Sequence, residues 1–245
     1  FFKNSTLIFS SEIKFITNIS SEKFYLNKNK AIDYIRYNNI FNDDSTLFKN
    51  INQVSPGSIL YYNDDKLKKN YYYKIEDRIN KNSANKNYIK KIIKNSIKLR
   101  LKADVKVGTM LSGGIDSSVI QYLSSNFNPN ISAYNISFKD NNIKDPEREF
   151  ILETINDCNI DANFLEIKFN TFKVNEMLKT IEMPFRSFTV PSQMMIFKTI
   201  KSNKKLKVLL SGEGADEVFS GYNKDIFIFM ISLLKKYKFI SFFKQ

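Results

Sequence analysis

The sequence predicts an α/β fold, in which a parallel sheet is covered by helices on both faces. Two observations lead to this prediction. From residue 88 onward, short apolar segments alternate with longer segments whose apolar residues recur at helical spacing. Two of the short segments run directly into a glycine-bearing turn that opens a helix. Strands that alternate with helices pair in parallel, because each helix carries the chain back across a face of the sheet.

The expected elements follow one another in regular order. Short runs rich in β-branched and apolar residues predict strands at 105–111, 131–138, 162–167 and 206–210. Helical spacing predicts helices at 88–101, 115–127, 147–159, about 171–182, 191–202 and from about 215 onward. In such sheets ligands bind beyond the carboxyl ends of the strands, and both glycine turns fall there.

Residues 80–87 read Asn-Lys-Asn-Ser-Ala-Asn-Lys-Asn and contain no apolar residue except Ala84, which is typical of a linker. An extended, tyrosine-rich stretch precedes them and ends at residues 71–73. We therefore expect two domains, 1–79 and 88–245, joined by the linker 80–87.

The composition narrows the classes of function. The formal charge of +13 is carried by lysines spread through a background rich in Asn, Ile and Phe, which favours a compositional bias over a nucleic-acid-binding face. No apolar run is long enough to span a bilayer, and a single cysteine fits a reducing cytosol. We expect a cytoplasmic protein without a nucleic-acid or membrane partner. The apolar segment 225–243 either packs against further helices or lies on a membrane surface.

The first glycine segment, residues 112–118, reads Ser-Gly-Gly-Ile-Asp-Ser-Ser and follows an apolar strand. Backbone N–H groups and the positive end of a helix dipole converge at such a turn, so phosphate oxygens bind well there. Asp116 would repel phosphates unless a magnesium ion lay between them. The alternative is an ordinary glycine turn capped by Asp and Ser.

The second glycine segment, residues 211–217, reads Ser-Gly-Glu-Gly-Ala-Asp-Glu and follows the strand at 206–210. Three carboxylates within five residues are costly unless a positive charge lies among them. A metal ion with its phosphates, or a substrate ammonium group, would supply that charge. The alternative is a solvated acidic first turn of a helix.

The first segment is not a Walker A loop, because Gly-x-x-x-x-Gly-Lys-Ser/Thr is absent from the sequence. It resembles the PP-loop of the ATP pyrophosphatases, which cleave ATP between the α and β phosphates. Four segments in order resemble the synthetase domain of glutamine-dependent asparagine synthetases and their amidotransferase relatives: 111–118, 132–138, 182–185 and 211–222. Three earlier segments resemble the end of the glutaminase domain of that family: 7–14, 46–51 and 54–58.

The resemblance implies an adenine nucleotide α-hydrolase-like PP-loop domain, preceded by the β-rich tail of an Ntn-hydrolase glutaminase domain. It implies that aspartate, ATP and ammonia from glutamine give asparagine, AMP and pyrophosphate through an acyl-adenylate, with Mg²⁺ as cofactor. The residues that it assigns to pyrophosphate are Ser112, Gly113, Gly114, Ser117 and Ser118. It assigns Leu111 and Ile136 to the nucleoside pocket, Ser211 and Gly212 to closure over the nucleotide, Asp116 and Asp216 to magnesium, and Glu213 to general base catalysis.

The identity of the acyl substrate stays open at this point. Met183 stands where the family pattern Asp-Glu-Pro-Phe has its second acidic residue, and Arg186 faces either a substrate carboxylate or solvent. The alternatives are an amidotransferase acting on a sugar acid or another carboxylate in polysaccharide biosynthesis, and a non-catalytic nucleotide-binding fragment. Glutamine hydrolysis in this family uses an N-terminal cysteine, and the only cysteine here is Cys158. We therefore expect a fragment of a longer protein, and leave open whether that protein is a homodimer.

Overall fold

The computed structural model describes residues 1–3, 6–37, 43–79, 85–138, 147–167, 173–185, 187, 189–203 and 206–235. The chain divides into two compact units. The first unit contains residues 1–83 together with 173–186, and the second contains 84–172 together with 187–245. Within the described residues, no helix has the length and apolar character needed to cross a membrane.

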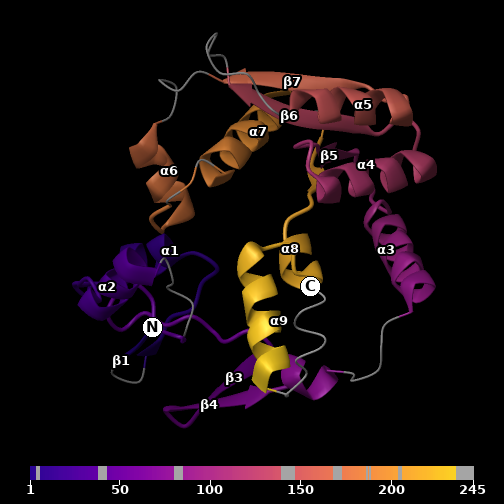
Figure 1. Ribbon diagram of the computed structural model, residues 1–245. Helices are drawn as coiled ribbons and strands as arrows, with labels where there is room; N and C mark the ends of the chain where they lie inside the picture. The colour runs from indigo at the N-terminus through magenta and orange to yellow at the C-terminus, as the bar shows by residue number, and fades with distance from the viewer. Residues whose placement is uncertain are drawn as a thin grey trace. The chain divides into compact units, whose positions relative to one another are not determined.

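The second unit contains a four-stranded sheet in which every neighbouring pair is parallel (Figure 1). The strands lie in the order β7-β6-β5-β8. Their bounds are β5 Val107–Met110, β6 Ser132–Phe138, β7 Ala162–Ile167 and β8 Val208–Leu210. The predicted parallel sheet is thus confirmed, with β5, which leads into the first glycine segment, beside β8, which leads into the second.

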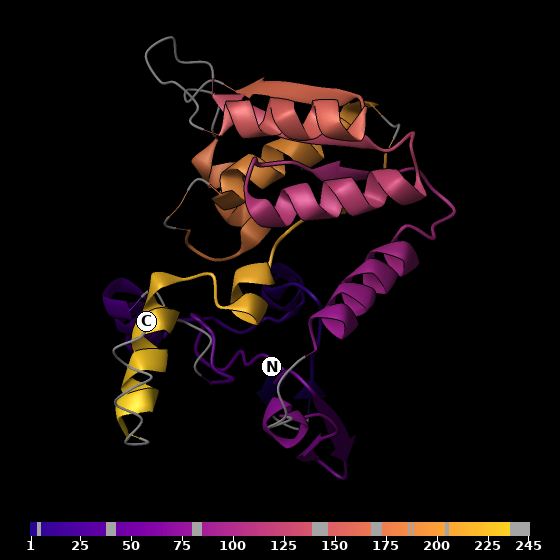
Figure 2. The same cartoon turned by 45° about the vertical axis from the view of Figure 1, so that its right-hand side comes forward.

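Helices cover both faces of this sheet, as predicted. The helices of the second unit are α3 Lys86–Arg100, α4 Ile115–Phe127, α5 Arg148–Cys158, α7 Thr189–Asn203, α8 Ala215–Phe219 and α9 Asn223–Lys235. Of these, α4, α5 and α7 pack on the sheet. Figure 2 shows α4 and α5 side by side in front of the sheet, with α7 behind it. Most helix ends differ from the predicted ones by a few residues. The helix predicted from about 215 onward is instead broken after Phe219, where Ser220 has a φ of +59°, and the chain is helical again from Asn223. The predicted apolar tail continues beyond α9 into residues that lie outside the described part of the chain.

Each face of the sheet has its own apolar core. Leu111 and Ala133 pack with Ile151 of α5 on one face, and Cys158 lies against the edge of this cluster. On the other face, Ile196 and Ile200 of α7 pack with Leu206 and with half-buried side chains from β5, β6, β7 and β8. Successive residues of β6, such as Ala133 and Tyr134, therefore point to opposite cores, as the alternation of a strand requires.

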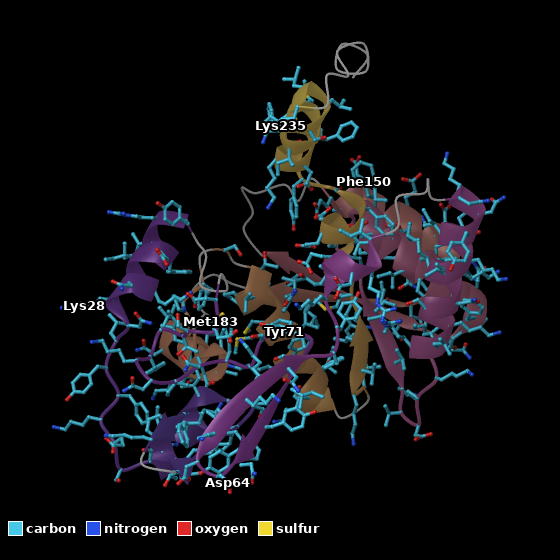
Figure 3. All side chains as sticks on the ribbon, turned by 90° about the horizontal axis from the view of Figure 1, so that it is seen from below. Lys28, Asp64, Tyr71, Phe150, Met183 and Lys235 are labelled. Carbon is cyan, nitrogen blue, oxygen red and sulfur yellow. The ribbon has the colours of Figure 1, made fainter. Side chains whose placement is uncertain are left out.

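The first unit is built from short elements. Their bounds are β1 Phe2–Lys3, β2 Thr6–Leu7, α1 Ile13–Ile19, α2 Lys28–Tyr37, β3 Ser58–Asn63, β4 Lys66–Tyr71, the 3₁₀ helix η1 Ile75–Arg78 and α6 Val174–Ile181. Strands β3 and β4 form an antiparallel hairpin with Ser58 opposite Tyr71. Figure 3 labels Asp64 in the turn of this hairpin and Tyr71 at its other end.

Helix α6 belongs to the first unit, which differs from the predicted division into 1–79 and 88–245. A pair of hydrogen bonds directly after the end of α6 joins this segment to α1. The backbone N–H groups of Ile13 and Lys14 donate to the carboxylate of Glu182, at 2.7 Å and 2.6 Å. These are the first N–H groups of α1, which have no partner within their own helix. Glu182 thus closes the start of α1 from 168 residues away along the chain.

Candidate functional site

A cavity of about 580 Å³ lies at the carboxyl ends of the strands in the second unit. This is the edge of a parallel sheet at which ligands bind. Ten of the twelve predicted site residues line it: Leu111, Ser112, Gly114, Asp116, Ser117, Ile136, Ser211, Gly212, Glu213 and Asp216. The other two, Gly113 and Ser118, line a separate hollow of about 690 Å³ bordered by α3, α4 and α5. The structure thus brings the two glycine segments to one place.

The first glycine segment is held together by its own hydroxyl groups. The backbone N–H of Ser112 donates to Oγ of Ser117 at 3.2 Å, and the two hydroxyl oxygens lie 3.1 Å apart. The Ser117 hydroxyl in turn donates to the carbonyl of Gly114 at 3.0 Å. These bonds close the turn directly before α4, whose first N–H groups and positive dipole end then point out of the turn.

The turn also needs a residue without a side chain at Gly113. Its φ is +87°, and a Cβ atom there would lie 2.8 Å from the carbonyl oxygen of Glu147. Behind the turn, the side-chain amide of Asn135 donates to the carbonyl of Leu111 at 2.8 Å. The hydroxyl of Thr109 on β5 donates to the side-chain oxygen of Gln121 on α4. Strand, turn and helix are therefore fixed to one another by buried polar contacts.

The second glycine segment lies directly against the first. A Cβ atom on Gly212 would be 2.9 Å from Cβ of Asp116 and 3.1 Å from the backbone nitrogen of Ser117. Such distances are shorter than side chains tolerate, so only glycine lets the two segments approach this closely. The next turn is closed by the N–H of Ala215, which donates to the carbonyl of Gly212 at 3.2 Å.

The cavity is strongly acidic. Five carboxylates line it: Asp116, Glu147, Glu213, Asp216 and Glu217. Among the described residues that line it, none is a lysine or an arginine. Carboxylates crowded in one place favour a cationic ligand or a metal ion. Arg186, which the sequence offered as a cation for the substrate, lies outside the described residues.

The carboxylates fit magnesium only in the presence of phosphate. Within the described part of the chain, no group of three or more acidic, cysteine or histidine side chains gathers closely enough to hold a metal by itself. Asp116 and Asp216 nevertheless line the same cavity. Magnesium commonly takes one or two protein carboxylates and completes its octahedron with phosphate oxygens and water. The two aspartates therefore suit a metal that arrives with a nucleotide.

Two of the carboxylates are held by side chains from elsewhere in the chain. Nε2 of Gln193 donates to Oε1 of Glu213 at 2.6 Å. The phenol of Tyr222 donates to Oε1 of Glu217 at 2.7 Å. That hydrogen bond, followed by partial burial and by the charges of nearby carboxylates, raises the pKa of Tyr222 to about 12. The same bond lowers the pKa of Glu217 below its ordinary value.

Sequence reasoning missed part of the cavity wall. Glu147 precedes α5, and Thr189, Ser192 and Gln193 come from the first turns of α7. No motif marks these positions, because a polar side chain in a helix is ordinarily solvated. Glu182, the first residue of the family-like segment 182–185, is bound to α1 in the first unit.

The asparagine synthase family profile matches residues 88–229, which is more than half of the chain. The chain therefore belongs to the asparagine synthase family. It is 27% identical over 224 residues to asparagine synthetase [glutamine-hydrolyzing] 1 of Bacillus subtilis, covering 90% of this chain and 35% of the relative. It is 26% identical over 247 residues to a putative asparagine synthetase [glutamine-hydrolyzing] 2 of Methanocaldococcus jannaschii, covering 96% of this chain and 47% of the relative.

The chain thus spans about a third to a half of the length of these curated relatives. Among solved structures, the NH3-dependent NAD synthetase from Campylobacter jejuni is similar with a TM-score of 0.39 and 19% identity, over 57% of this chain and 62% of that one.

Proposed function

We propose that this protein forms an amide by ATP-dependent activation of a carboxylate, most simply the conversion of aspartate, ATP and ammonia from glutamine into asparagine, AMP and pyrophosphate. One observation carries the proposal. Two glycine segments, one suited to phosphates and one bearing carboxylates, touch each other in a single cavity. Membership in the asparagine synthase family supports the same class of reaction.

The first step requires that the phosphates be held and the carboxylate be brought to the α-phosphorus. Ser112, Gly114 and Ser117 offer hydroxyl and backbone donors at the start of α4, and Gly113 and Ser118 shape that turn from behind. The carboxylate oxygen attacks the α-phosphorus, and pyrophosphate leaves with the electron pair of the broken P–O bond. An acyl-adenylate results, which ammonia can attack because AMP is a far better leaving group than oxide.

The nucleoside and the metal have candidate positions in the same cavity. Leu111 and Ile136 offer apolar contacts for adenine or ribose, and Ser211 and Gly212 lie across from them on the second segment. Asp116 and Asp216 would hold magnesium, which supplies positive charge that neutralises the phosphates and the leaving pyrophosphate.

The second step moves a proton. Ammonia attacks the carbonyl carbon of the acyl-adenylate, the C–O bond to AMP breaks, and the nitrogen must lose a proton as the amide forms. Glu213 lines the cavity, and the described residues that line it with Glu213 include no lysine or arginine. We assign to Glu213 the role of general base for this proton.

A sugar acid or another hydroxylated carboxylate is the second candidate substrate. The described cavity wall offers neutral hydroxyl and amide groups from Thr189, Ser192 and Gln193 and no cation for a second substrate carboxylate. Hydroxyl-rich substrates would hydrogen-bond to such a wall, whereas aspartate also brings an ammonium group that the acidic cavity favours.

The test is ATP–pyrophosphate exchange by the full-length protein with Mg²⁺, in the presence and absence of aspartate. Aspartate-dependent exchange supports adenylation of aspartate. Exchange with a uronic acid but not with aspartate would show that the carboxylate substrate is a sugar acid. Binding of ATP without exchange for any carboxylate contradicts the proposed reaction and leaves a nucleotide-binding module.

A further inference from the structure

Gln193 makes a short contact with the candidate general base. It lies in the second turn of α7, and its amide Nε2 donates to Oε1 of Glu213 at 2.6 Å. Twenty residues separate the two side chains along the chain. They come from different elements of the second unit, so the contact depends on how α7 packs against the sheet.

The packing of α7 fixes where Gln193 lies. Ile196 and Ile200 are 4% and 7% exposed, and both belong to the core between α7 and the sheet. Gln193 precedes Ile196 by three residues and therefore shares its face of the helix. Both side chains line the cavity. The apolar core of α7 thus places an amide at the carboxyl end of the sheet.

The chemistry of an amide suits a partner of a base. A glutamine side chain is neutral and does not ionise near neutral pH, so it can donate to one carboxylate oxygen without competing for the proton. A lysine or arginine in the same place would add a strong charge, and a carboxylate would repel Glu213. The other oxygen of Glu213 is left to receive a proton from ammonia.

The main chain of Glu213 is held separately from its side chain. Its backbone N–H donates to Oγ of Ser211 at 3.4 Å, within the turn that follows β8. The side chain is exposed at the cavity wall and would otherwise sample several rotamers. A base that samples several rotamers is correctly oriented toward the reacting ammonia for only part of the time. The hydrogen bond from Gln193 restricts that freedom.

We propose that Gln193 is a positioning residue that orients the carboxylate of Glu213 for the ammonia-dependent step. The proposal rests on the assignment of Glu213 as general base. It separates the two steps of the reaction, since Gln193 acts on proton removal and leaves adenylation to the first glycine segment.

The test compares Gln193→Leu with the wild type in the full-length protein, and uses Lys201→Leu on the exposed side of α7 as the matched control. Three rates are measured with Mg²⁺, ATP and aspartate: pyrophosphate exchange, asparagine formation from ammonium chloride, and hydroxamate formation from hydroxylamine.

For Gln193→Leu we expect an unchanged rate of pyrophosphate exchange and about a 10- to 100-fold lower rate of asparagine formation from ammonia, the loss typical of a displaced base. The rate with hydroxylamine falls less, because its less basic nitrogen loses its proton to water more readily. Lys201→Leu leaves all three rates at the wild-type level.

Two results overturn the proposal: an unchanged rate with ammonia, or an equal loss in all three rates, which would mean a structural role. If the wild type shows no exchange with aspartate, the proposal that aspartate is the substrate is refuted. The role of Gln193 is then tested by crystal structures of the wild type and of Gln193→Leu. Glu213 should occupy one conformer bonded to Gln193 in the wild type and several in the variant, and a single unchanged conformer in both contradicts the proposal.

Discussion

The two glycine segments of the cavity differ in where their polar groups find partners. In the first, residues 112–118, hydroxyl and backbone groups bond to one another within seven residues. In the second, residues 211–217, the carboxylates of Glu213 and Glu217 are bonded to side chains outside the segment, Gln193 and Tyr222. The turn of the first segment is held by its own groups, although Oγ of Ser118 also accepts a hydrogen bond from Thr154 of α5 at 3.2 Å. The first segment is neutral apart from one aspartate, while the second is acidic and its carboxylates depend on side chains outside the segment.

This difference matches the two tasks proposed for the segments, phosphate binding for the first and proton transfer for the second. Phosphates are best bound by donors that are already fixed, because then little reorganisation is needed when charge develops. A general base must instead keep one oxygen available and be aligned by a neighbour. The comparison therefore predicts that damage to the first segment stops adenylation, whereas damage to the partners of the second affects the later step.

The largest expected effect comes from separating the two segments. In Gly212→Val, the new side chain meets Asp116 and the backbone of Ser117, which lie 2.9 Å and 3.1 Å from the position of Cβ. A displacement of about 1 Å is enough to lower the rate on the order of 100-fold. We expect ATP–pyrophosphate exchange to fall at least that far, while the thermal unfolding transition stays cooperative. Exchange at the wild-type rate would show that contact between the segments is dispensable.

Glu182 lies outside the cavity, and both oxygens of its carboxylate accept hydrogen bonds from backbone N–H groups, so its removal should lower stability rather than activity. Glu182→Ala removes the acceptor of the Ile13 and Lys14 N–H groups, and we expect a loss of about 1–3 kcal/mol in the free energy of unfolding of the first unit. Urea denaturation measures this loss. Glu176→Ala, which breaks an exposed ion pair with Lys173, is the control and should cost less than about 1 kcal/mol. Equal losses for the two variants would refute the capping role of Glu182.

The smallest effect concerns the tyrosine partner of the second segment. The hydrogen bond to Glu217 raises the pKa of Tyr222 to about 12, compared with about 10 in an unfolded chain. The pair therefore stabilises the folded state fully below about pH 10 and loses that contribution as the pH rises toward 12. The ultraviolet titration difference between the wild type and Tyr222→Phe should show one tyrosine ionising near pH 12. Ionisation of that tyrosine near pH 10 would mean that the bond to Glu217 is absent in solution.

Local pattern predicted most of the strands and helices of the second unit and the two glycine segments that line the cavity. Strands, turns and helices recur with distinct periods, and the carboxyl ends of parallel strands lie at one edge of the sheet, which brings 112–118 and 211–217 to the same edge. Their direct contact depends in addition on the pairing of β5 with β8, which local pattern does not reveal. Gln193 and Glu182 could not be predicted. Each depends on a contact between distant elements, Gln193 with Glu213 and Glu182 with α1, and nothing in the residues next to them marks such a contact.

The division of labour between the two segments is tested most directly by Glu213→Gln in the full-length protein. The substitution keeps the size of the side chain and removes its ability to take a proton. With Mg²⁺, ATP, aspartate and ammonium chloride, we predict pyrophosphate exchange at the wild-type rate and asparagine formation lowered about 100-fold or more. Asparagine formation at the wild-type rate would contradict the assignment of the proton-transfer step to the second segment, and loss of exchange together with synthesis would contradict the separation of the two steps.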